Sequence, residues 1–430
     1  MDSQTPESWR PNIQRRVDGL VQQTASFQQN INPYQGFVHQ EKPGDWGQAS
    51  IEGSEKKITK SVDRITGIDI ARALSLLGMI LAHFVPARES THVIGVILGT
   101  VHGRASLAFV VIAGIGITLL LGAKSPHESI RIVLWRAGVL FMLGILLQEV
   151  SPGPIIILQF YAFYYVVGWV GAQLPTWALA LTTASWLGIG CSLWWINAPR
   201  LVVSSFLDSP VKQLASILYN GQYPLVTWGS AVLAGVLLGR VDWQDRRIVK
   251  ALACAALVGI VGIHGAAGLT QQVLLARGVG EIPVWATITP HSNTIFYLVE
   301  GEASATFLVA FCVLVAPYLG KAGRALATAG RQALTLYICH LLWLYVFSFV
   351  EEWIILGVIG DSLLYGENAL ELYETIAVSL RYVAAFTCFI VLVIQANIWG
   401  LFFKFGTFEY LLRPPSGLAH KLIRYGKTHR

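Results

Sequence analysis

Apolar runs of about twenty residues, separated by shorter polar segments, recur along the chain from residue 66 onward. Runs of this length are typical of helices that cross a bilayer, because a helix rises about 1.5 Å per residue and the hydrocarbon core is about 30 Å thick. The pattern therefore predicts ten spanning helices. They cover residues 66–86, 106–123, 131–149, 155–172, 176–196, 223–240, 249–269, 302–320, 333–357 and 378–403.

The composition supports this interpretation. The 430 residues are 54% hydrophobic and only 13% charged. Soluble globular domains carry about 25% charged residues, so the composition excludes that class. The predicted fold class is all-α, a polytopic integral membrane protein with about ten transmembrane helices. The five cysteines lie inside apolar runs without a CxxC pattern, and we interpret them as small packing residues.

Polar segments flank the predicted membrane domain at both ends. Residues 1–62 are rich in Gln, Ser, Pro and Asn and carry seven acidic and seven basic residues. Such a segment cannot bury enough apolar surface to offset its ordering entropy, so we predict a disordered cytoplasmic tail. The membrane domain then covers residues 63–413, and residues 414–430 form a basic cytoplasmic tail.

The distribution of Lys and Arg among the short connections predicts the orientation. With a cytoplasmic N-terminus, every basic cluster next to a span falls on the cytoplasmic side. These clusters are Lys124, Arg131 and Arg136; Arg240, Arg246, Arg247 and Lys250; Lys321, Arg324 and Arg331; and the C-terminal tail. We therefore predict a multi-pass protein of the cell membrane with both termini in the cytoplasm.

Three ionisable residues interrupt the first apolar run. Arg72 and His83 are eleven positions apart, about 20° past three full turns, so they share one helix face about 16 Å apart along the axis. Asp69 lies three residues before Arg72, close enough to pair with it. Singly, the histidine could be interfacial and the arginine could extend to headgroups. Because intramembrane charges are costly, the three together predict a functional site.

Further polar residues in apolar surroundings are candidates for substrate binding. They are Arg104, Glu149, Gln159, Tyr223, His291 and His340. Arg104 lies on the predicted outer side, so it either has a partner such as a carboxylate or extends to headgroups. His291 either contacts substrate or is solvated, and His340 either lines a passage or is a core histidine. The long outer loops 197–222 and 270–301 are either lids over the site or ordered linkers.

Several pieces of the sequence resemble known families. Arg72 and His83 resemble the Arg-x10-His signature of the membrane acyltransferase-3 superfamily, in an Asp-x2-Arg-Ala-Leu setting. A longer ordered set is similar to the bacterial branch of the heparan-alpha-glucosaminide N-acetyltransferase-like family. Its pieces are Gly103–Ile117, Arg136–Leu147, Ile157–Gly168, Asn220–Trp243, Pro290–Ser292, Ala333–Leu342 and Phe405–Arg413. The last piece departs from an expected Gly-Pro-Leu-Glu form, because Thr407 and Phe408 replace Pro-Leu.

The resemblance implies that residues 63–413 form a transmembrane acyltransferase domain. Such an enzyme would move an acyl group, most simply acetyl, from cytoplasmic acyl-CoA to a hydroxyl or amine of an extracytoplasmic sugar, glycolipid or envelope glycan. His83 would act as general base or take the acyl group covalently. Arg72, held by Asp69, would orient the donor or stabilise charge. Acetyl-CoA or another acyl-CoA would be the co-substrate, without a metal.

The expected partners are the acyl-CoA, the glycan or glycolipid and the lipid bilayer, and a homodimer is left open. Nucleic-acid binding is not expected, because the basic residues border membrane segments.

Two other functions are compatible with the pattern. A small-molecule or lipid transporter or flippase also places charges along a substrate path, but it predicts inverted repeats, of which the sequence gives no convincing sign. An inert scaffold would not need Arg72 and His83 on one face. Purified protein would distinguish the three functions: an acyltransferase transfers acyl groups, a transporter shows substrate flux, and a scaffold does neither.

Overall fold

The computed structural model describes residues 64–85, 99, 101–122, 124–150, 153–197, 209–365 and 368–414. The chain divides into two units, Met1–Val62 and Asp63–Arg430, and every described residue lies in the second unit. The predicted tail over residues 1–62 lies outside the described residues, as does almost all of the predicted C-terminal tail.

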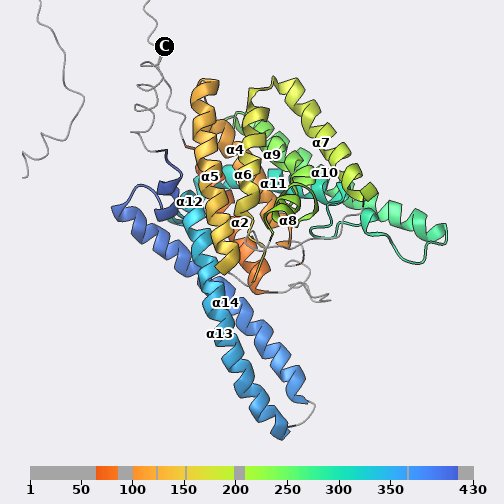
Figure 1. The fold of residues 1–430 in the computed structure, drawn as a ribbon, viewed down its shortest axis with the longest axis vertical. Helices are drawn as coiled ribbons and strands as arrows, with labels where there is room; N and C mark the ends of the chain where they lie inside the picture. The colour runs from red at the N-terminus through yellow and green to blue at the C-terminus, as the bar shows by residue number, and fades with distance from the viewer. Residues whose placement is uncertain are drawn as a thin grey trace, which may run out of the picture. The chain divides into compact units, whose positions relative to one another are not determined.

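Helices form nearly all of the described chain, and no strand occurs in it, which confirms the all-α prediction. The long helices are α2 (Thr66–Phe84), α4 (Arg104–Leu121), α5 (Pro126–Val150), α6 (Leu158–Gln173), α7 (Thr176–Asn197), α9 (Leu225–Leu238), α10 (Arg246–Ala276), α11 (Ile295–Val315), α13 (Ala333–Tyr365) and α14 (Asn368–Phe402). Each of the ten predicted spans coincides with one of them (Figure 1). Shorter elements are α8 (Pro210–Ala215), the π-helix η2 (Ser216–Asn220), the 3₁₀ turns η3 (Val284–Ala286) and η4 (Ala316–Tyr318), α12 (Gly320–Arg331) and α15 (Thr407–Leu411).

The number of spans is about eight rather than ten. Within the described ranges, eight helices are long and apolar enough to cross a membrane. The two that fall short are α6, with 16 residues, and α9, with 14. Helix α9 packs against α4, α6, α7 and α11, and nine of its residues are buried. Apolarity on all sides of a helix can thus reflect burial among neighbouring helices, which the sequence pattern cannot distinguish from contact with lipid.

Helix α2 is the most enclosed of the long helices. Thirteen of its 19 residues are buried. It packs against α4, α11, α12, α13 and α14 (Figure 1). The helix that carries Asp69, Arg72 and His83 is therefore held by segments from both halves of the chain.

Glycines allow the closest helix contacts, as at the crossing of α4 and α9. A Cβ atom built on Gly114 would clash with the Val232 carbonyl oxygen and lie 2.8 Å from Gly235 Cα. Gly235 faces the α4 backbone at Val111 in the same way. Small residues let two helix backbones approach closely, which is the main source of packing energy between helices in lipid.

Two features between the last spans were not predicted. Helix α12 occupies a segment expected to be a loop, and its Gly330 packs against the backbone of Asp69 on α2. Helices α13 and α14 also extend into residues 358–377, the gap between the last two predicted spans (Figure 1). An Arg381–Glu351 ion pair of 2.5 Å joins the two helices.

The C-terminal helix α15 caps the start of α13. The Glu409 carboxylate accepts hydrogen bonds from the backbone nitrogens of Leu334 at 2.7 Å and Thr335 at 3.1 Å, and from the Thr335 hydroxyl at 2.5 Å. A carboxylate at this position satisfies unpaired N–H groups and complements the helix dipole. The glutamate of the C-terminal sequence piece thus fixes the beginning of α13.

Gly114→Ala is expected to lower stability by about 1–3 kcal/mol, because the new methyl group must displace the α9 backbone. Gly138→Ala is the matched control, since a Cβ atom there meets nothing within 4 Å and alanine favours the helix. Thermal unfolding in detergent compares the two. Equal melting temperatures for both variants would contradict the described α4–α9 contact.

Glu409→Ala is expected to cost about 0.5–2 kcal/mol, the usual effect of losing a helix cap. Glu352→Ala, which removes a carboxylate with no described partner, is the control. Hydrogen exchange should show faster amide exchange at Leu334 and Thr335 in the first variant. Unchanged exchange at both amides would contradict the cap.

Candidate functional site

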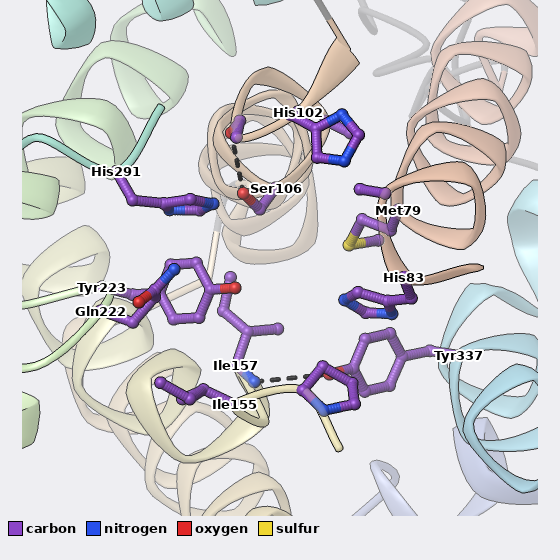
Figure 2. Close-up of a pocket in the computed structure, with 14 residues that line it drawn as sticks. Met79, His83, His102, Ser106, Ile155, Ile157, Gln222, Tyr223, His291 and Tyr337 are labelled. Atoms are coloured by element: carbon purple, nitrogen blue, oxygen red, sulfur yellow. Dashed lines mark hydrogen bonds between the residues drawn. The ribbon is translucent and has the colours of Figure 1, made fainter. Parts of the chain in front are cut away.

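A cavity of ≈ 260 Å³ lies where several helix ends meet. The end of α2, the starts of α4, α6 and α9, the loop before α11 and one turn of α13 line it. Its polar lining consists of His83, His102, Ser106, Gln222, Tyr223, His291 and Tyr337. Figure 2 shows the three histidines facing the same space from different elements. No Asp, Glu, Lys or Arg belongs to this lining, so its imidazoles are the side chains best suited to take up a proton from a substrate.

His83 is backed by a second histidine. Its Nδ1 lies 3.1 Å from Nε2 of His340, and the two rings stack with centroids 5.3 Å apart. His340 is fully buried and packs edge-on against Tyr337, which itself lines the cavity. In such a pair one nitrogen donates and the other accepts, so the tautomer of each ring depends on the other. His340 therefore lies behind His83 and outside the lining, which fits the expectation of a core histidine bonded to a neighbouring helix.

His291 is half-buried in the cavity wall. Its backbone has φ of 58°, its ring stacks on Trp228, and Tyr223 meets it edge-on at 5.3 Å. Its Nδ1 is buried without a hydrogen-bond partner in the described structure. Burial, reinforced by His102 and His83, lowers the pKa of His291 to about 4. The ring is thus neutral at physiological pH and can accept or donate one hydrogen bond.

The two long loops that the sequence left as lids or linkers both contribute to the cavity. Gln222 comes from the first, directly before Tyr223, and His291 comes from the second. Tyr223 is held in place because its carbonyl oxygen accepts a hydrogen bond of 2.5 Å from the Tyr164 hydroxyl. Both loops are therefore part of the cavity wall.

Asp69 and Arg72 lie at the opposite end of α2 from His83. The buried Asp69 carboxylate accepts hydrogen bonds from Arg72 at 2.8 Å and from Arg64 at 2.6 Å. Arg72 also donates to the Gly330 carbonyl at 3.3 Å, which connects α2 to α12. The predicted pairing of Asp69 with Arg72 is confirmed. The structure does not bring either residue into the cavity with His83.

Arg104 has the carboxylate partner that its position suggested. Its Nε donates to Glu300 at 2.6 Å, and both side chains are largely buried. This pair lines a second, neighbouring cavity between α2, α4, α10 and α11. Arg104 is therefore next to the histidine cavity without lining it.

The two remaining candidates lie apart from the cavity. Gln159 is buried, and its side-chain oxygen accepts a hydrogen bond of 2.7 Å from Gln213 of α8. Glu149 is exposed near the end of α5 and lines neither of the two cavities. Gln159 thus links two helices, which is a packing role.

Sequence reasoning did not select His102, Tyr337 or Glu300. His102 lies two positions before Arg104, and its Nε2 lies 3.0 Å from the Val85 carbonyl oxygen just beyond α2. The sequence signal for His102 was a histidine near the start of a predicted span, on the same predicted side of the membrane as His83. Tyr337 and Glu300 carry no such signal, because one tyrosine or carboxylate near a helix start is ordinary. The described residues hold no group of three His, Cys, Asp or Glu placed to bind a metal ion.

The fold and the cavity define a polytopic helical membrane protein with a histidine-lined site at one end of its bundle. Residues 64–270 match the family model described as heparan-alpha-glucosaminide N-acetyltransferase, catalytic. This match confirms the resemblance found in the sequence. The similar pieces beyond residue 270 lie outside the matched region. No curated protein matches the chain.

The buried His291 makes stability depend on pH. In the unfolded chain its pKa is near 6.5, whereas in the folded chain it is about 4. Between these values the unfolded state binds more protons, so stability falls as pH drops from 6.5 toward 4. We expect the melting temperature of His291→Gln to fall less over this range than that of the wild type. His127→Gln, at an exposed site on α5, is the control, and identical pH profiles for all three proteins would contradict the burial of His291.

Proposed function

We propose that the protein is a transmembrane acetyltransferase that uses acetyl-CoA as donor and a hydroxyl or amine of an extracytoplasmic sugar as acceptor. The observation that carries the proposal is the placement of His83 in the wall of a cavity with His340 bonded behind it. Acetyl-CoA use comes from the family that residues 64–270 match.

The geometry suits a proton transfer at His83. With Nδ1 engaged by His340, the other ring nitrogen, Nε2, is the one that can act on a group in the cavity. In the proposed step, Nε2 of His83 takes the proton of the acceptor hydroxyl or amine. At the same time the oxygen or nitrogen of the acceptor attacks the thioester carbonyl. The carbon–sulfur bond breaks, and the coenzyme A thiolate leaves and takes up a proton. A histidine placed within reach of the transferred proton is the commonest general base in enzymes.

An acyl-histidine intermediate is the other route through the same nitrogen. His83 Nε2 would attack the thioester carbonyl first, and the carbon–sulfur bond would break to release the coenzyme A thiolate. The acceptor would then attack the acyl-imidazole, and the carbon–nitrogen bond to His83 would break as the acceptor proton passes to the released imidazole. Trapping of labelled acetyl on the protein in the absence of acceptor distinguishes this route from direct transfer.

We place the donor phosphates at the other end of α2, near the basic connections that follow the positive-inside pattern. In this proposal both termini and those connections are cytoplasmic, and the His83 end of the bundle faces outward. Asp69 and Arg72 then hold α2 on α12 beside the donor path, so their contribution is positioning. The surrounding membrane would be the cell membrane.

The test is transfer of radiolabelled acetyl from acetyl-CoA by purified protein in nanodiscs, with a glycan and lipid extract as acceptor. His83→Gln is expected to lower kcat by about 10²–10⁴-fold, the usual contribution of a general acid or base. His127→Gln is the matched exposed control. Thermal unfolding establishes that each variant is folded.

His340→Gln separates positioning from packing. We expect a loss of kcat with little change in KM for acetyl-CoA, and a shifted pH–rate profile, because His340 sets the tautomer of His83. If His83→Gln transfers acetyl as fast as the wild type, the proposal is wrong. Substrate flux across vesicles without any acyl transfer would instead identify a transporter.

A further inference from the structure

The second cavity, of ≈ 430 Å³, combines a buried charge cluster with an apolar wall. It lies between α10 on one side and α2, α4 and α11 on the other. Its polar groups are Arg104, Glu300, Ser304, His264 and Ser75, and aliphatic side chains form most of the rest. We call this cavity the α10 groove.

Hydrogen-bond acceptors dominate the polar part of the α10 groove. The Glu300 carboxylate accepts from Arg104 Nε at 2.6 Å and from the Ser304 hydroxyl at 2.8 Å, and a carboxylate has about four acceptor positions in total. The Ser75 hydroxyl donates to the Ala71 carbonyl, so its oxygen can still accept. His264 Nε2 is 3.8 Å from Glu300, and its side chain is 53% exposed.

This chemistry favours a ligand with hydroxyl groups over an anionic one. Glu300 already neutralises Arg104, so a phosphate would meet a carboxylate and serine acceptors without a free positive charge opposite it. Hydroxyl groups can donate to Glu300, Ser75 and Ser304 and accept from an N–H of the His264 ring. The polar part of the groove thus suits a sugar.

The apolar wall of the groove continues onto the outward face of α10. Ile260 and Leu308 line the groove, and Val258 and Val261, beside Ile260, are 71% and 66% exposed. Helix α10 is one of the eight candidate spans, so its exposed apolar face meets lipid tails. A ligand with a hydroxyl-rich head at Glu300 can therefore keep its hydrocarbon chain in the bilayer.

The groove lies next to the histidine cavity. Ala105 lines both, and a Cβ atom on Gly78 would lie 2.7 Å from Ala105 Cβ and 2.9 Å from Val101. The smallest side chains of α2 and α4 thus form the wall between the two spaces. The contact between Gly78 and Ala105 therefore lies between a head group in the groove and the cavity that His83 lines.

We propose that the α10 groove binds the sugar head of a membrane-embedded glycolipid, with the lipid chain lying against α10. Its role in bringing a glycolipid acceptor to His83 rests on the proposed acetyltransferase function. The binding itself does not depend on that function.

The test measures binding alone. Purified protein in an amine-oxide detergent is titrated with monoglucosyl diacylglycerol, and bound lipid is counted by native mass spectrometry. Phosphatidylcholine with the same acyl chains is the reference. We expect tighter binding of the glucolipid by about tenfold, as befits several hydrogen bonds made by its hydroxyl groups.

Two tryptophan variants locate the site. Ile260→Trp fills the groove and is expected to lower glucolipid affinity at least about tenfold, whereas Leu275→Trp, at an exposed position in the last turn of the same helix, leaves it unchanged. His264→Phe keeps the ring volume and should lower affinity for the glucolipid but not for phosphatidylcholine. The half-exposed position of His264 makes a folding defect from this variant small.

Equal binding of the two lipids, or full binding by Ile260→Trp, would overturn the proposal. His83→Gln separates it from the proposed function, because that variant should bind the glucolipid normally while failing to transfer acetyl. Glucolipid binding without acetyl transfer in the wild type would leave the groove assignment standing and refute the acetyltransferase. Acetyl transfer with no preference for the glucolipid in the binding assay would refute the groove assignment and leave the acetyltransferase standing.

Discussion

The structure depends on how one enclosed helix keeps its polar groups satisfied. Helix α2 is buried along most of its length, yet it carries a carboxylate, a guanidinium and an imidazole. A buried polar group without a partner costs more than most single contacts contribute. Each of the three therefore requires a partner, and for Arg72 and His83 another segment supplies one. Asp69 and Arg72 are paired beside α12, and His83 is paired with α13. These pairings tie the C-terminal helices to the first one.

The candidate site follows from the same constraint. His83 ends α2 at the point where α4, α6 and α9 begin, so a cavity forms among helix ends and two connecting segments. The C-terminal Glu409 fixes the start of α13 and hence the height at which Tyr337 and His340 reach His83. Residues as far apart in the chain as His83 and Glu409 thus contribute to the geometry of one site. The same holds for the α10 groove, where the Arg104–Glu300 pair joins α4 to α11.

Several predictions from the sequence were confirmed because they rest on local physics. The ten helices and the pairing of Asp69 with Arg72 follow from apolar periodicity and helical spacing. For Arg104 the sequence left two alternatives open, and the structure shows the one with a carboxylate partner. The described chain has about eight candidate spans instead of ten, because α6 and α9 are shorter than the others. The last two helices are longer than predicted, since α13 and α14 continue into the gap between the last two predicted spans.

The sequence by itself determined the class of protein, the helices and the residue on which the proposed chemistry depends. It also carried the family resemblance, which the match over residues 64–270 confirms. Only the tertiary structure decided which residues share a cavity. It placed His102, His291 and Tyr223 with His83, moved His340 behind His83, and left Arg72, Gln159 and Glu149 elsewhere. The reason is that hydrophobic periodicity specifies which face of a helix is buried, whereas the partner of that face depends on contacts between distant segments, such as His83 and His340, 257 positions apart.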